Sequence, residues 1–141
     1  MTARLLIVAL LAALAVACGD DPSSTAPSST TSTTTTVTYA GTIDVGGSRF
    51  YSFSNAAAGS VTAFLASVTS PATRLPVAVP LEIGIGVPAG TGCSTTTTQM
   101  VAPGLVPQMT VSLAAGVFCL RVADAGELRA PVAFAVRFSH P

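Results

Sequence analysis

The feature that most constrains the fold of this chain is an alternation of apolar and small or polar side chains, with a period of two, from Tyr39 onward. It is clearest near the C-terminus, where Val132, Phe134, Val136 and Phe138 alternate with Ala133, Ala135 and Arg137. A period of two sends successive side chains to opposite faces of a strand, and no window after residue 38 shows a helical stripe. The alternation therefore predicts an all-β domain whose strands each bury one face.

Short strands separated by glycine and proline turns predict an antiparallel β-sandwich, jelly-roll or immunoglobulin-like, with about seven or eight strands. The expected strands cover residues 41–45, 49–53, 61–68, 81–87, 109–113, 118–122 and 132–138. Turns are expected at Gly46-Gly47 and at residues 55–60. Residues 88–108 are rich in proline, glycine and threonine, so we expect a long loop there, pinned by Cys93.

The first residues have the pattern of an export signal. Arg4 precedes an uncharged apolar run over residues 5–17, and Cys18 closes that run in the sequence LAVAC. The run would span only about 20 Å as a helix, short of the roughly 30 Å hydrocarbon core, so a permanent transmembrane helix is not expected. LAVAC resembles the lipobox of bacterial lipoproteins, in which the chain is cut before the cysteine and the thiol is acylated. We therefore expect a lipoprotein signal peptide over residues 1–17; ordinary secretory cleavage nearby is the alternative.

Residues 18–38 are expected to form a flexible linker that begins at the lipidated Cys18. Thirteen of the sixteen residues from Ser23 to Thr38 are serine or threonine, too few apolar groups to offset the entropy of ordering. The domain would then cover residues 39–141. Glycine rather than aspartate follows Cys18, which in enterobacteria favours the outer membrane over the plasma membrane. We expect a lipid-anchored protein of the bacterial cell envelope.

Two cysteines remain once Cys18 is assigned to the lipid. Cys93 and Cys119 are an even pair, and a disulfide is the expected state of such a pair in an oxidising compartment. Free thiols or a metal site are the alternatives, although two cysteines and one distant histidine fall short of the four ligands of structural zinc.

Three segments resemble a known family. The stretch from Gly41 to Val68 is similar to the opening of bacterial pre-peptidase C-terminal domains, with a Gly-Thr strand, a glycine turn and a Tyr-x-Phe strand. Residues 113–126, LAAGVFCLRVADAG, are similar to their Ala-Gly-x-Tyr-x-Val-Arg-Val segment, and residues 132–138 to their closing strand. The resemblance implies a non-catalytic jelly-roll-like sandwich. Some relatives bind calcium or extracellular polymers, but this chain lacks the acidic cluster that the calcium-binding members use.

Catalytic chemistry has few candidates in this sequence. His140, the only histidine, precedes the last residue, and chain ends tend to fray, so we expect a solvated tail residue. Asp124 and Glu127 lie in the sequence DAGE, which predicts a turn rather than an acid/base pair. Gly84 and Gly86 are not spaced as in a phosphate-binding loop, and no helix pattern follows them. We expect no catalytic residue, no metal site and no cofactor.

The candidate ligand contacts are Phe50, Arg121 and Arg137. Alternation places Phe50 on an outer face, and Arg121 is expected to point outward with Arg137 on a neighbouring strand, where the two could bind an acidic glycan. Pairing of Arg121 with Asp124 or Glu82 is the alternative.

The overall charge excludes nucleic acid as the partner, because six arginines balance six acidic residues and no basic patch is visible. We expect a non-catalytic lipoprotein, held to the membrane by its lipid, whose sandwich serves as an interaction or structural module. A carbohydrate- or peptidoglycan-binding accessory module is the alternative, and the absence of tryptophan weakens it. The partner would be an envelope protein or a glycan.

Overall fold

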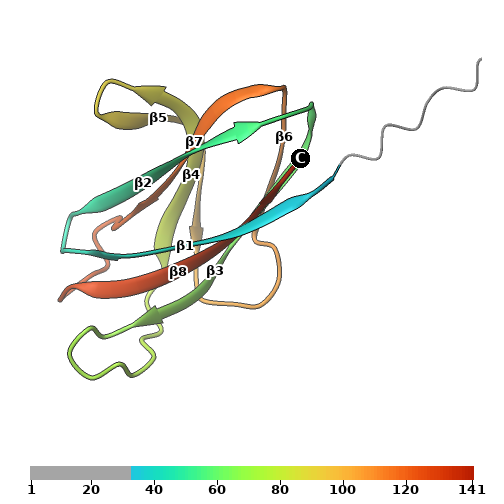
Figure 1. Cartoon of the computed structure of the whole chain (residues 1–141). Helices are drawn as coiled ribbons and strands as arrows, with labels where there is room; N and C mark the ends of the chain where they lie inside the picture. Colours follow the sequence, from blue (N-terminus) through green and yellow to red (C-terminus); the bar gives the residue numbers. More distant parts are fainter. Residues whose placement is uncertain (1–32) are drawn as a thin grey trace, which may run out of the picture. The chain divides into compact units, whose positions relative to one another are not determined.

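The computed structural model describes residues 33–141, which contain eight β-strands (Figure 1). They are β1 (Thr35–Ile43), β2 (Ser48–Asn55), β3 (Gly59–Thr69), β4 (Leu81–Ala89), β5 (Gly92–Val101), β6 (Met109–Leu113), β7 (Gly116–Ala123) and β8 (Val132–His140). The predicted signal peptide, Cys18 and most of the predicted linker lie outside the described residues.

The strands form two four-stranded sheets with antiparallel pairing throughout. Sheet I has the order β1-β8-β3-β6, and sheet II has the order β2-β7-β4-β5. Eight strands that cross between two sheets in this order form a jelly roll. The predicted antiparallel β-sandwich of seven or eight strands is confirmed.

The hydrophobic core lies between the two sheets and follows from the alternation in the sequence. In sheet I the four apolar residues of β8 that alternate with small or charged residues are all buried, and in sheet II so are Leu81, Ile83 and Ile85 of β4. Each such side chain contributes about 1.5–3 kcal/mol by leaving water. The opposite face of β8 is part of an outer surface of the sandwich, whereas Gly84 and Gly86 on the opposite face of β4 are buried.

The prediction of a loop over residues 88–108 is wrong for residues 88–101, which belong to a β-hairpin. β4 and β5 pair almost along their whole lengths through a tight turn at Gly90, whose φ of 55° suits glycine. The threonine run that suggested a loop is β-branched and favours a strand. Pro88 is tolerated because it lies beyond Gly86, the last β4 residue that pairs with β7. Only residues 102–108 form the loop.

The first strand begins earlier than the predicted domain boundary at Tyr39. Thr35 pairs with His140 and Thr38 with Arg137, in register with the rest of β1. Val37 is half-buried within this segment. The end of the threonine-rich segment therefore belongs to sheet I, because its backbone hydrogen-bonds to β8.

Candidate functional site

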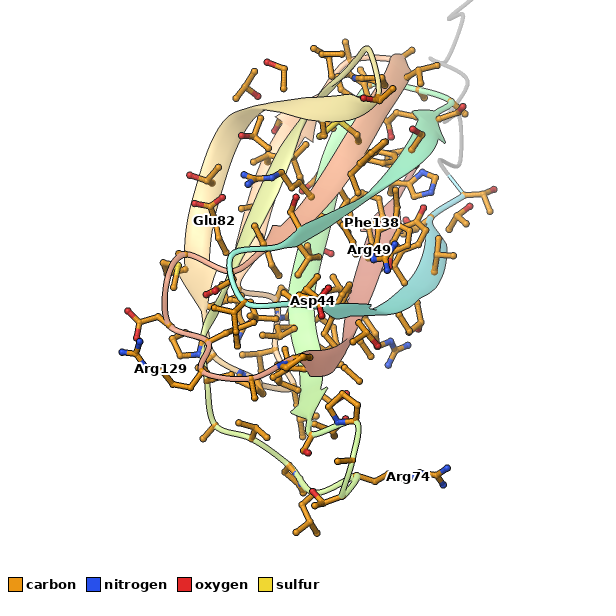
Figure 2. The ribbon with its side chains drawn as sticks, turned by 90° about the vertical axis from the view of Figure 1, so that its left-hand side faces the viewer. Asp44, Arg49, Arg74, Glu82, Arg129 and Phe138 are labelled. Carbon is orange, nitrogen blue, oxygen red and sulfur yellow. A yellow bond between two sulfur atoms is a disulfide. The ribbon has the colours of Figure 1, made fainter. Side chains whose placement is uncertain are left out.

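The outer face of sheet II carries two of the three candidate ligand contacts. Phe50 of β2 lies opposite Arg121 of β7 in the register, and Phe50 is 41% exposed. Arg121 donates a hydrogen bond from Nη1 to Oε1 of Glu82 at 2.9 Å, so the predicted alternative of a pair with Glu82 is confirmed (Glu82 is labelled in Figure 2). With its charge paired, Arg121 offers hydrogen bonds beside an aromatic ring rather than a free cation.

Arg137 does not join this face, which corrects the prediction that it and Arg121 lie on neighbouring strands. β7 belongs to sheet II and β8 to sheet I, because the chain crosses between the sheets at residues 124–131. The guanidinium carbon of Arg137 lies 5.9 Å from the ring centroid of Phe64, on the outer face of sheet I. The two arginines therefore cannot hold one acidic glycan between them.

A disulfide joins β5 to β7 across β4. Cys93 and Cys119 are bonded, with Cα atoms 5.9 Å apart, which confirms the predicted pairing. β4 lies between these two strands in the sheet, and strands two positions apart in a flat sheet are separated by about 9.6 Å. β5 must therefore fold over the outer face of β4 at this point. Closing a loop with a sequence separation of 26 residues stabilises the fold by about 3.5 kcal/mol in the chain-entropy model.

Two glycines of β4 provide the space for this crossing. A Cβ atom at Gly86 would lie 1.9 Å from the carbonyl oxygen of Ser94, and one at Gly84 would lie 2.6 Å from Cγ2 of Thr95. The pairing of β4 with β5 shifts register between Ile85 and Gly86, which is where a bulge bends the strand. The spacing of Gly84 and Gly86 does not match a phosphate-binding loop. Their lack of side chains instead leaves room for β5 to pack over β4.

Asp124 organises the turn after β7, which confirms the predicted turn. Its Oδ1 accepts hydrogen bonds from the backbone N–H groups of Gly126, Glu127 and Leu128, at 2.8, 2.8 and 3.1 Å. Its Oδ2 accepts one from the N–H of Gly46 at 2.8 Å. These hydrogen bonds, that of Gly46 foremost, hold the pKa of Asp124 below its ordinary value. The carboxylate of Asp124 thus holds its own turn and ties it to the β1–β2 turn at Gly46.

His140 corrects the prediction of a solvated tail residue. It ends β8, pairs with Thr35 and is buried. Its ring centroid lies 5.3 Å from that of Phe53 and 5.5 Å from that of Phe138. Its Nδ1 lies 3.0 Å from the carbonyl oxygen of Pro141, so the ring closes one end of the core. Position in the sequence could not reveal this, because Phe53 comes from β2.

The corner between β1 and β2 is closed by side chains. The rings of Tyr39 and Tyr51 stack with centroids 4.6 Å apart, and the hydroxyl of Tyr51 donates to the carbonyl oxygen of Ala40 at 2.9 Å. Nε of Arg49 donates to the carbonyl oxygen of Thr42 at 3.0 Å. Burial raises the pKa of both tyrosines, and the charge of Arg49 opposes this at Tyr51. The protonated hydroxyl of Tyr51, on β2 of sheet II, thereby links to the backbone of β1 in sheet I.

Two apolar pockets, of about 230 and 360 Å³, share Val77 in the loop between β3 and β4. The smaller pocket is lined by Ser70 and Glu127, and no hydrogen bond joins these two side chains within residues 33–141. No group of three or more histidine, cysteine, aspartate or glutamate side chains within residues 33–141 could hold a metal ion. The same residues contain no helix long and apolar enough to cross a membrane.

No protein-family model matches the chain, and no curated protein matches it significantly. The resemblance to pre-peptidase C-terminal domains therefore stays a prediction from the sequence.

Proposed function

We propose that this protein is a non-catalytic lipoprotein of the bacterial cell envelope, in which acylated Cys18 tethers a β-sandwich interaction module. The observation that carries the proposal is the position of Cys18, directly after the apolar run and directly before the polar segment. Several acyl chains on one cysteine anchor a protein stably, whereas one chain binds only marginally. The disulfide between Cys93 and Cys119 supports a location outside the reducing cytoplasm.

The connectivity of the domain leaves one end of the sandwich distant from the point where the chain enters, and this supports a contact with a partner at that end. The chain enters at Thr35, beside the C-terminal residues, and the loops at residues 44–47, 70–80 and 124–131 lie at the other end of the sandwich. The nine residues of β1 separate the two ends by about 30 Å. Figure 2 shows Arg74 at the tip of the second loop, pointing away from the sandwich. We place contact with an envelope protein at this end, away from the point of attachment.

Labelling with a palmitate analogue tests the lipid anchor. The full chain, expressed in a bacterium with an outer membrane, should incorporate the label and sediment with the membranes. Cys18→Ser should lose both properties. Gly19→Asp is the matched variant, because it keeps the acceptor cysteine: it should retain the label and move toward the inner membrane. An unlabelled, soluble wild-type chain would contradict the proposal.

A second candidate function is glycan binding on the outer face of sheet II. The exposed ring of Phe50 beside the paired Arg121 and Glu82 favours it, since an aromatic ring and fixed hydrogen-bonding groups can hold a sugar. Retention on peptidoglycan and on a glycan array should fall at least tenfold in Phe50→Ala. Phe64→Ala is the control, because Phe64 lies beside an arginine on the other sheet. Equal retention by both variants would contradict a site at Phe50.

A further inference from the structure

The outer edge of β5 is an open strand edge. β5 is the last strand of sheet II, so one of its sides has no neighbouring strand among residues 33–141. All five residues from Thr96 to Met100 are exposed, although they alternate between the two faces of the sheet. Both faces of this segment are accessible to solvent, and no strand pairs with its outer side within residues 33–141. A strand with these properties is a template for pairing with another strand.

Two other exposed stretches of strand backbone, in β1 and in β3, are covered by side chains. The side chains of Arg49 and Tyr51 donate hydrogen bonds to backbone carbonyl groups of β1. Beyond the end of β6, Gln108 covers the free edge of β3. Its side-chain oxygen accepts a hydrogen bond from the backbone N–H of Leu65 at 2.9 Å, and its backbone N–H donates one to the carbonyl oxygen of Ala63 at 3.0 Å. Within residues 33–141, no comparable hydrogen bond reaches the outer side of β5.

The β5 edge also lacks the charges that commonly prevent strands from pairing between molecules. No aspartate, glutamate, lysine, arginine or histidine occurs from Ile83 to Leu120. Three large apolar side chains on or just after β5 are exposed: Met100 by 44%, Leu105 by 86% and Val106 by 67%. An uncharged edge beside exposed apolar groups meets no electrostatic penalty on approaching a copy of itself.

We propose that two copies of this chain pair through β5, antiparallel, about a two-fold axis at Gln99. The β4–β5 register is regular from Thr97 to Val101 and shifts only before that segment, so this part of the edge is straight enough to extend the sheet. The axis would set Gln99 against its own copy and Thr98 against Met100. The two amides can exchange hydrogen bonds, and no charge meets a like charge.

A second copy suits this edge better than an unrelated strand for two reasons. A two-fold contact needs a self-complementary strand, and the amide of glutamine is both donor and acceptor. The disulfide at Cys93 holds the start of β5 against β7, so one end of the edge is fixed before pairing. The resulting sheet would have eight strands, four from each copy. The pairing does not depend on lipidation, which would only raise the local concentration.

Cysteine crosslinking tests the axis directly. In the full chain carrying Cys18→Ser, which removes the other free thiol, Gln99→Cys should form a disulfide-linked dimer on mild oxidation. Residues facing each other across an antiparallel pair have Cα atoms about 4.5–5.5 Å apart, within reach of a disulfide. Thr110→Cys, at an exposed position of β6, is the control and should stay largely uncrosslinked. Equal crosslinking of both variants, or none of Gln99→Cys, would overturn the proposal.

Charge at the axis gives a second, independent measurement. Gln99→Lys places two ammonium groups opposite each other and should weaken dimerisation at least tenfold by analytical ultracentrifugation, whereas Thr110→Lys should not. Circular dichroism would establish that both variants fold. A wild-type chain that is monomeric at all concentrations would overturn the proposal, as would a dimer unaffected by Gln99→Lys. A monomer that takes up an extended peptide at β5 would assign the edge to another chain instead.

Discussion

Replacement of Gly86 by alanine tests whether β5 crosses over the outer face of β4. The added Cβ would lie 1.9 Å from the carbonyl oxygen of Ser94 and 2.6 Å from Cα of Thr95. Both contacts are with backbone, which cannot rotate away as a side chain can. Separations below 3.0 Å are essentially never seen for a Cβ atom, so β5 must move by at least about 1 Å. This movement would displace Ser94, the residue next to Cys93.

We expect Gly86→Ala to lower the free energy of unfolding by about 2–4 kcal/mol. Overpacking alone costs about 1–3 kcal/mol, and part of the stabilisation by the disulfide, about 3.5 kcal/mol, is lost if β5 shifts away from β7. Gly92→Ala is the matched control in the same hairpin. The nearest non-adjacent atom to its added Cβ is 3.7 Å away, so its effect should stay within about 0.5 kcal/mol.

Urea unfolding followed by circular dichroism measures both variants, because the chain has no tryptophan to report by fluorescence. The measurement is made with the disulfide intact and again after reduction. Reduction should shrink the penalty of Gly86→Ala, since an unclamped β5 can move aside, and the two perturbations should therefore couple by about 0.5–3 kcal/mol. Equal stability of Gly86→Ala and Gly92→Ala in the oxidised protein would refute the crossing.

Three further predictions concern residues placed by the fold. Replacing Cys93 and Cys119 together by alanine should lower the free energy of unfolding by about 3.5 kcal/mol in urea, and a loss below about 1 kcal/mol would contradict the loop-closure account. The folded-state pKa of Asp124 is lowered, so its stabilising effect is present above the unfolded pKa and is lost as pH falls through the folded one. Thermal unfolding should accordingly show stability decreasing below about pH 4, with a flatter profile in Asp124→Asn. His140→Ala should cost about 2 kcal/mol in urea because it empties one end of the core; an unchanged midpoint would mean that the C-terminus frays.

Sequence alternation predicted strands well wherever one face is buried and the other is less so, as in β3 and β8. It failed at β5, where every residue from Thr96 to Met100 is exposed. An edge strand that is bare on both faces needs no apolar alternation, so its threonine run resembled a loop. His140 was misjudged for a related reason, because the rings that bury it come partly from β2 and its neighbours in sequence do not reveal them.

Sequence alone determined which side chains of most strands face the core, because that follows from residue type and short-range period. It also predicted the pairing of Cys93 with Cys119, once Cys18 was assigned to the lipid. Only the tertiary structure decided which sheet each strand joins. That choice depends on pairing between distant residues, such as Thr35 with His140, for which a period of two carries no information. The assignment of strands to sheets placed Arg121 and Arg137 on opposite outer faces of the sandwich. It also brought the backbone of β5 over Gly86, so that only a residue without a side chain fits there.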